Sequence, residues 1–453
     1  MYYNTLLKGA DAVKSKVITL VILFCTALLL TGCSMRTVEQ MYTPPKRSEE
    51  FKELQSAIDT AMYGLTFSSP QSGENQQTVQ MADLDGDGVD EFLVFAKGAS
   101  EKPLQVLIFK QDEDGSVRTM DTIGSNGLAF EQVEYVEFDE RPGYELVVGF
   151  QVGDQVVRSV AVYTFVDGDA QLLLLNSYSK FLTCDMDEDG RKELMVFRPG
   201  EGESERGMAV LYSTRNGQIE RSVETELSEP PNQIRRIQLG RLSDGTSAVF
   251  VSSTAGENEL VTDIFSMRDG RFTNISFSSD AETSIRTLRN YYVFPEDINN
   301  DSITELPCLI TMKPVSNWRD EEQKFLLRWF SIDEMGWETD KMYTFHNYIG
   351  GWYMRLNSAW ASRVTVDQGD GTYTFYVWDE TYESALELFT IYVFKGSTRD
   401  EDTTADGRVS LYRTEGVAYA GKLAEGASDY DITVQYLIDS FSLIRQDWRT
   451  GET

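Results

Sequence analysis

The sequence predicts a mainly β fold: a five-bladed β-propeller, or alternatively a six-bladed one, with an N-terminal helix and a C-terminal α+β domain. One acidic loop design recurs at residues 83–91, 185–193 and 297–305, and a short apolar run follows each copy. Successive copies begin 102 and 112 residues apart. Each interval is about two propeller blades, since a blade of four strands takes about 40–50 residues.

Two degenerate units lie midway between the loops, as this spacing requires. Residues 137–145 precede the apolar run at 146–150 and keep some acids, whereas residues 240–248 precede 249–251 and have lost nearly all of them. We expect no metal in either. Short apolar or alternating runs separated by Gly, Asp and Asn turns indicate four strands per unit. Because one unit cannot bury both of its faces, the five units should stack into a ring over residues 78–348.

Each acidic loop has the residue pattern of a calcium site. Calcium takes about six to eight hard oxygen ligands. Side chains at loop positions 1, 3 and 5, a main-chain carbonyl at position 7 and an acid at position 9 can converge on one ion. The predicted ligands are Asp83, Asp85, Asp87, Val89 and Glu91; Asp185, Asp187, Asp189, Arg191 and Glu193; and Asp297, Asn299, Asp301, Ile303 and Glu305.

The three loops should not bind equally well. Gly88 and Gly190 at position 6 permit a sharp bend, because glycine reaches positive φ without strain. The third copy has Ser302 there and Asn299 at position 3, so we expect it to be the weakest. An EF-hand is disfavoured, since it needs glutamate at position 12 and flanking helices. A plain Asp/Gly turn that binds nothing is the remaining alternative.

The loop and the strand after it resemble the FG-GAP or VCBS repeat of integrin-like propellers and of many bacterial surface proteins. The residues that carry the resemblance are the alternating acids, the position-6 glycine and the following apolar run of each copy. The resemblance implies that each loop joins neighbouring strands of one blade. It also implies that the calcium is structural.

The N-terminus resembles a bacterial lipoprotein signal. Lysines in residues 1–16 precede the apolar run 17–30, and Leu30-Thr-Gly-Cys33 follows. This resemblance implies that residues 1–32 are a signal peptide and that Cys33 carries acyl chains such as palmitate. The protein would then be lipid-anchored on the extracytoplasmic face of the cell membrane, where two or more chains give stable attachment. An uncleaved anchor helix is the alternative.

The mature chain divides by composition. Residues 33–47 are predicted to be a tether, 48–64 an amphipathic helix, 65–349 the propeller, and 350–453 the α+β domain, which resembles the PsbP-like sandwich. The apolar residues of the helix form a single stripe. The formal net charge of −32 disfavours nucleic acid as a partner.

No catalytic residue is predicted. The chain has one histidine, and it lacks a nucleotide-binding glycine motif. We therefore expect a calcium-stabilised binding module for a protein or glycan. An accessory subunit of an envelope complex and a carboxylate-based glycosidase are the alternatives. Aromatic residues gathered between Trp318 and Trp360 are predicted to form either the domain core or a binding platform.

Overall fold

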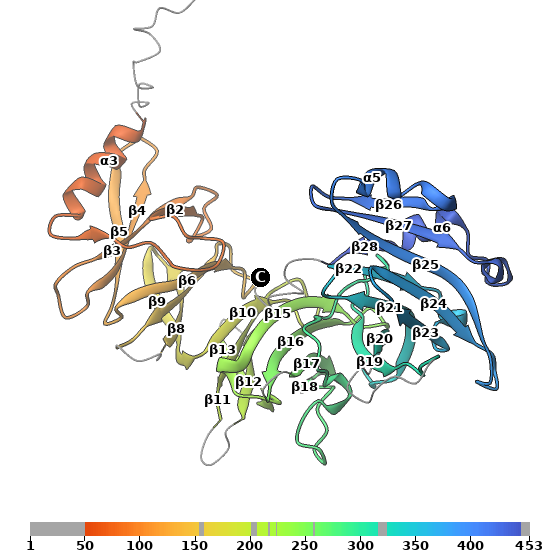
Figure 1. Cartoon of the computed structure of the whole chain (residues 1–453). Coiled ribbons are helices and arrows are strands. Elements are labelled where there is room, and N and C mark those ends of the chain that lie inside the picture. The colour runs from red at the N-terminus through yellow and green to blue at the C-terminus, as the bar shows by residue number, and fades with distance from the viewer. Residues whose placement is uncertain are drawn as a thin grey trace, which may run out of the picture. The chain divides into compact units, whose positions relative to one another are not determined.

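The computed structural model describes residues 50–153, 158–200, 206–215, 218–222, 224–256, 259–315 and 324–444. The predicted signal peptide (1–32), Cys33 and the tether (33–47) lie outside these residues. The described chain is mainly β and forms six antiparallel sheets, none of which closes into a barrel (Figure 1). Within these ranges, no helix has the length and apolar character needed to span a membrane.

Two compact units divide the described residues. The first contains residues 50–60, which are most of α3 (Glu50–Ala61), and residues 111–117. The second contains all other described residues. The helix α3 falls within the range predicted to be helical. Its apolar residues Leu54 and Ile58 are four positions apart and buried. Gly64 follows the helix with a φ of +80°, a left-handed conformation that glycine adopts without strain.

The first two sheets are antiparallel meanders in chain order. The first contains β1 (Thr66–Phe67) and β2 (Val79–Ala82), which both pair with β3 (Glu91–Lys97), then β4 (Leu104–Gln111) and β5 (Val117–Ser125). The second contains β6 (Ala129–Val136), β7 (Glu145–Gln151), β8 (Arg158–Val166) and β9 (Asp169–Tyr178).

The third and fourth sheets repeat the meander. The third contains β10 (Lys180–Cys184), β11 (Glu193–Pro199), β12 (Gly207–Arg215), β13 (Gln218–Arg221) and β14 (Thr225–Glu226). The fourth contains β15 (Ile234–Arg241), β16 (Ser247–Ala255), β17 (Glu259–Arg268) and β18 (Arg271–Asn274). The 3-10 turns η1 (Pro231–Gln233) and η2 (Ile285–Thr287) precede and follow the fourth sheet.

The last two sheets contain the remaining strands, between residues 306 and 443. The fifth has the order β19 (Leu306–Thr311), β20 (Phe325–Ile332), β21 (Glu338–Asn347), β22 (Trp352–Leu356), β28 (Phe441–Leu443). The sixth has the order β23 (Val364–Gln368), β24 (Thr372–Trp378), β25 (Ala385–Lys395), β27 (Val417–Leu423), β26 (Val409–Arg413). The helical segments are α4 (Ser358–Ala361), α5 (Arg399–Asp402), η4 (Ala405–Gly407), η5 (Glu425–Tyr430) and α6 (Val434–Ser440).

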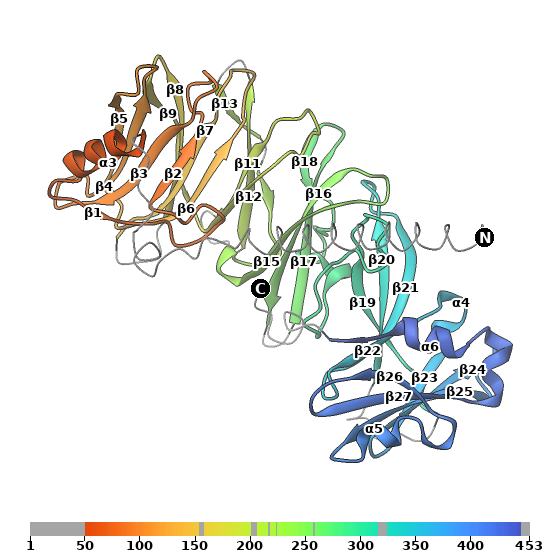
Figure 2. The ribbon, with the colours of Figure 1, turned by 90° about the horizontal axis from the view of Figure 1, so that it is seen from above.

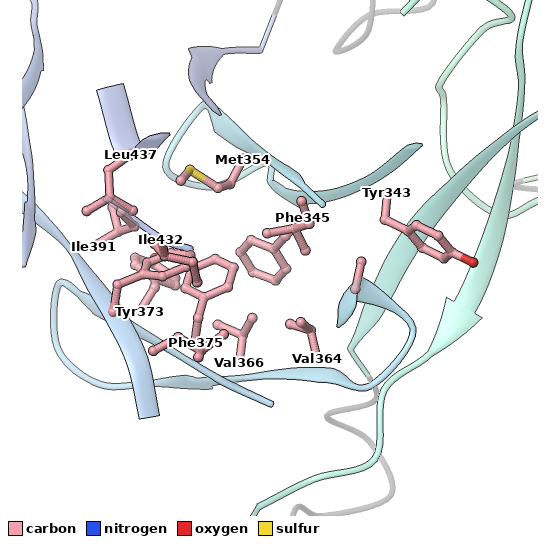
Figure 3. Packing of buried hydrophobic residues seen from close by; sticks show 14 of the residues in the cluster. Tyr343, Phe345, Met354, Val364, Val366, Tyr373, Phe375, Ile391, Ile432 and Leu437 are labelled. Atoms are coloured by element: carbon pink, nitrogen blue, oxygen red, sulfur yellow. The ribbon is translucent and has the colours of Figure 1, made fainter. Parts of the chain in front are cut away.

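Consecutive sheets pack face to face through shared apolar clusters, two of which lie between the fourth and fifth sheets (Figure 2). Phe95 of the first sheet meets Phe130 of the second edge to face, with ring centroids 5.1 Å apart. Phe345 of the fifth sheet meets Phe375 of the sixth in the same way at 5.3 Å, in the cluster shown in Figure 3. Apolar burial of this kind contributes about 25 cal/mol per Å² removed from water.

The second strand of each repeat is buried on both faces. All residues from Phe92 to Ala96 are buried, and so are those from Leu146 to Phe150 and from Leu194 to Phe197. Because both faces of these strands are buried, the sequence there is a continuous apolar run rather than an alternating one. This explains the apolar runs that follow the first two acidic loops and the loop at residues 137–145.

Candidate metal centres

The three acidic loops occupy equivalent places in their sheets. Residues 83–91 connect β2 to β3, and residues 185–193 connect β10 to β11. Residues 297–305 lead into β19, and the strand before them is reduced to one bridge between Glu296 and Glu305. The first two loops therefore precede a doubly buried strand, whereas β19 after the third loop is buried only at Leu306 and Pro307.

A common hydrogen-bond frame shapes all three loops. In each, the position-6 N–H donates to the position-1 carboxylate, at 2.9 Å (Gly88 to Asp83), 3.1 Å (Gly190 to Asp185) and 2.8 Å (Ser302 to Asp297). The N–H groups of Val89, Arg191 and Ile303 at position 7 each donate to the position-5 aspartate at 2.9 Å. The side chains at positions 1 and 5 thus fold the backbone around themselves.

The backbone of each loop is left-handed at positions 4 and 6. Position 6 is Gly88, Gly190 or Ser302, with φ of +87°, +90° and +68°. The bend predicted for glycine is therefore kept in the third copy with serine, a residue that is strained in this conformation. This strain supports the expectation that the third loop is less well formed.

Carboxylate oxygens converge in every copy. Each group below offers one oxygen per residue, all within 4.8 Å of one another: Asp83, Asp85 and Glu91; Asp185, Asp187 and Glu193; Asp297, Asp301 and Glu305. Asp87 and Asp189 at position 5 lie outside these groups. Asn299 at position 3 instead donates from its amide to Asp301 at 3.1 Å. Three oxygens of this kind in one place could hold a metal ion.

The position-9 glutamate anchors each group from inside the sheet. Glu91, Glu193 and Glu305 are 0%, 4% and 0% exposed, and each accepts a hydrogen bond at Oε2 from the position-2 N–H. Burial raises the pKa of Glu193 and of Glu305 to about 7. Among the described residues, the Oε1 atom of Glu305 has no hydrogen-bond donor, whereas that of Glu91 lies 3.3 Å from Lys110 Nζ. A cation beside these oxygens would offset the cost of burying them.

The sequence did not reveal Lys110 as part of the first site. Its Nζ lies 2.6 Å from Asp87 Oδ2 and 3.3 Å from Glu91 Oε1, and it also contacts Asp85. Burial by itself would lower the pKa of Lys110, but hydrogen bonds to these three acids raise it above its ordinary value. The register of β3 with β4 is the signal that places this lysine, and it is known only once the strands are paired.

The degenerate loops keep parts of the same design. In residues 137–145, buried Glu145 accepts from the N–H of Phe138 at 3.0 Å, as the other position-9 glutamates do. The Arg141 guanidinium supplies the positive charge there in place of a metal ion, 2.6 Å from Asp139 and 3.8 Å from Glu145. In residues 240–248, Asp244 closes a turn by accepting from the N–H of Thr246 at 3.0 Å, and it also accepts from the N–H of Glu334 at 2.9 Å.

Main-chain hydrogen bonds connect loops of neighbouring sheets. The N–H of Tyr144 donates to the carbonyl of Asp83 at 2.9 Å, and the N–H of Lys192 donates to that of Glu137 at 3.1 Å. The N–H of Thr304 donates to the carbonyl of Arg241 at 2.9 Å. A Cβ at Gly86 would lie 2.3 Å from Pro142, so the first two loops are in direct backbone contact. The acidic loops and degenerate loops therefore lie along one edge of the sheets.

A cavity of about 1060 Å³ opens beside the second acidic loop. Asp187, Asp189 and Glu193 line it on the loop side. Its walls come from the loop of the second sheet and from turns of the third and fourth sheets. Five arginines line it (Arg141, Arg191, Arg215, Arg221 and Arg271) against six acids (Asp139, Glu140, Asp187, Asp189, Glu193 and Glu220). A divalent ion held by the loop would turn this balance positive.

The aromatic residues before the C-terminal region serve mainly as core. Trp329, Trp352 and Trp360 are buried, while Trp337 is 74% exposed and Trp318 lies outside the described residues. His346 is buried too, with Nε2 2.9 Å from Thr344 Oγ1 and its ring stacked on Tyr353. The core interpretation of this cluster is therefore confirmed for its three buried tryptophans.

Comparisons with known proteins give no family. No protein-family profile and no curated protein matches the sequence. Solved structures that align include an exotype rhamnogalacturonan lyase, YesX, at 13% identity and TM-score 0.26, covering 72% of this chain and 63% of that one. A Bacillus licheniformis rhamnogalacturonan lyase aligns at 14% identity and TM-score 0.27, covering 71% and 72%. A protein from Lactobacillus plantarum aligns at 9% identity and TM-score 0.23, covering 70% and 85%. Similarities this low imply neither a shared fold nor an activity.

Proposed function

We propose that the chain is a calcium-stiffened binding module: a β-propeller of five blades, or alternatively six, that belongs to a lipoprotein anchored through Cys33 on the extracytoplasmic face of the cell membrane. The observation that carries the proposal is the repeated loop. Three copies, far apart in the chain, share one hydrogen-bond frame and gather three carboxylate-bearing residues each.

The donor set favours calcium over softer metals. Only oxygen ligands converge in the three groups, and hard divalent cations prefer oxygen. The carbonyls of Val89, Arg191 and Ile303 would add the position-7 ligand, and Asp87, Asp189 and Asp301 the position-5 ligand. Calcium tolerates the irregular geometry of such loops better than magnesium does.

Chelation is expected to destabilise the protein. An ion that binds only the folded chain stabilises it by about 2.7 kcal/mol when free calcium is 100 times Kd. We expect the midpoint of thermal unfolding to fall by several degrees when EGTA replaces millimolar calcium, and to recover on adding calcium back. Asp187→Asn should lessen this response, whereas Asp280→Asn, on an exposed residue outside the loops, should keep it. An unchanged midpoint in EGTA would refute the calcium role.

The cavity beside the second loop is the proposed ligand site. Its size suits a small-molecule or oligosaccharide segment. Arginines recognise carboxylate and sulfate groups through paired hydrogen bonds, and a bound ion can share ligand oxygens. Arg215, which pairs with Glu220 at 3.8 Å, and Arg271 both line the cavity wall. A glycan with acidic groups is therefore the partner class that we favour.

Binding to this cavity should depend on both charge and calcium. On an array of neutral, uronic-acid and sulfated oligosaccharides, we expect the calcium-loaded protein to retain acidic members. The double variant Arg215→Glu/Arg271→Glu should lose at least tenfold in affinity, because it reverses two charges at the wall. Arg286→Glu reverses one charge at an exposed site away from the cavity and should bind as the wild type does. Equal binding by all three proteins would contradict the placement.

A further inference from the structure

The ammonium of Lys110 lies among the carboxylates where an ion of the first loop would lie. Lys110 belongs to β4, which pairs with β3, and Phe92 faces Phe109 in that pairing. One step further along the register, Lys110 stands opposite Glu91. Its Nζ is 2.6 Å from Asp87 and 3.3 Å from Glu91 and also contacts Asp85, while its side chain is only 13% exposed.

The other sheets carry neutral hydroxyl residues at this register position. Continuing the strand registers by one step places Thr164 opposite Glu145, Ser213 opposite Glu193 and Ser331 opposite Glu305. Thr164 Oγ1 indeed lies 3.2 Å from Glu145 Oε1. Of these four positions, only the one in the first sheet places a fixed positive charge in its loop.

We propose that Lys110 is the resident cation of the first loop, which therefore does not take up a divalent ion while this lysine is present. Calcium binds oxygen at about 2.3–2.6 Å, so it needs the volume that the ammonium fills. Displacing Lys110 would move a nearly buried side chain into solvent or leave its ammonium without its three acidic partners. The first loop, whose ligand set in sequence is as complete as that of the second, thus becomes the least available one.

Lys341 lies at the periphery of the third loop, in contrast to Lys110 at the first loop. At the third loop its Nζ reaches only Asp301, at 3.1 Å, and its side chain is 25% exposed. The buried Oε1 of Glu305 has no donor among the described residues, so the third loop still presents an unsatisfied oxygen to an ion. The order expected from sequence, with the third loop weakest, is reversed by this inference.

The second sheet makes the same substitution with another residue. Arg141, at position 5 of the degenerate loop, pairs with Asp139 and approaches the buried Glu145. A side-chain cation therefore neutralises the buried glutamate in the first two sheets, which leaves the second and third acidic loops for metal. This inference refines the proposed calcium binding and can fail separately from it.

Calcium stoichiometry tests the inference on the full-length protein. After treatment with EGTA and dialysis, isothermal titration should give two calcium equivalents for the wild type and three for Lys110→Met, which keeps the stem and removes the charge. Lys341→Met is the matched control and should stay at two. Three equivalents in the wild type, or no gain in Lys110→Met, would overturn the inference.

Further variants keep the test decisive if Lys110→Met does not fold. With Lys110 present, Asp85→Asn should leave the stoichiometry of the wild type unchanged, whereas Asp187→Asn should remove one equivalent. Loss of an equivalent in Asp85→Asn would show that the first loop binds calcium and would refute the role of Lys110. No calcium in the wild type but one equivalent in Lys110→Met would support the role of Lys110 and reject the proposed calcium stiffening.

Discussion

Replacing Asp263 with alanine is expected to lower the free energy of unfolding by about 4 kcal/mol, because buried donors lose their acceptor. Asp263 lies on β17 and is 0% exposed. It accepts hydrogen bonds from the N–H and the hydroxyl of Ser228 at 2.8 and 2.6 Å, from the Ser284 hydroxyl at 2.6 Å and from the Asn274 amide at 2.9 Å. One carboxylate thus joins three segments of chain.

Urea denaturation of matched variants would measure this effect. Asp263→Asn keeps one carbonyl acceptor and should lose less stability than Asp263→Ala. The exposed Asp280 lies nearby in sequence, and Asp280→Ala should change stability by no more than about 0.5 kcal/mol. If Asp263→Ala lowered the free energy of unfolding by less than about 1 kcal/mol, the hydrogen bonds to this carboxylate would not stabilise the fold as predicted.

Acidification is expected to destabilise the protein through His346. Burial lowers the pKa of His346 from 6.5 to about 3. Between pH 6.5 and about pH 3, His346 binds a proton in the unfolded chain but not in the folded chain, so the free energy of unfolding falls as the pH falls through this window. The contribution of His346 to stability is fully present above pH 6.5. The slope is about 1.4 kcal/mol per pH unit for one such group.

A comparison with His346→Gln isolates this contribution from the titration of the many carboxylates. Glutamine can keep a hydrogen bond to Thr344, which in turn accepts from the Trp329 indole at 2.8 Å. The stability of the wild type minus that of His346→Gln should decrease steadily when urea midpoints are measured from pH 7 to pH 4 in constant EGTA. A difference that does not change with pH would mean that His346 has the same pKa in the folded and the unfolded chain, which would contradict the prediction.

Local sequence patterns predicted much of the fold. The recurrence of the acidic loops predicted the four-strand period. The turn Gly369-Asp370-Gly371 has the residue pattern of a hairpin, and β23 and β24 form one. Apolar residues from Ile432 to Ile444 fit one face of a helix, but α6 ends at Ser440, and Phe441 pairs with Met354 of β22. Pairing across almost ninety residues has no local signal, so the sequence could not show it.

The sequence predicted where the candidate sites lie, but not which cation lies in each of them. Alternating acids predicted the loop frame because these side chains bind their own backbone, a local interaction. The roles of Lys110 and Arg141 depend on which strand lies beside each loop and on which buried glutamate each cation faces. The weakness assigned to the third loop rested on composition alone, whereas Lys110 affects the first loop through tertiary contact.

The shared apolar layers between successive sheets have a consequence for how such chains evolve. Every inner sheet offers its neighbours two faces of the same kind, built on a doubly buried second strand. Duplication or loss of one whole unit would join surfaces that already match, whereas a partial unit would leave a face uncovered. Lineages of this chain should therefore differ in length by steps of a complete repeat.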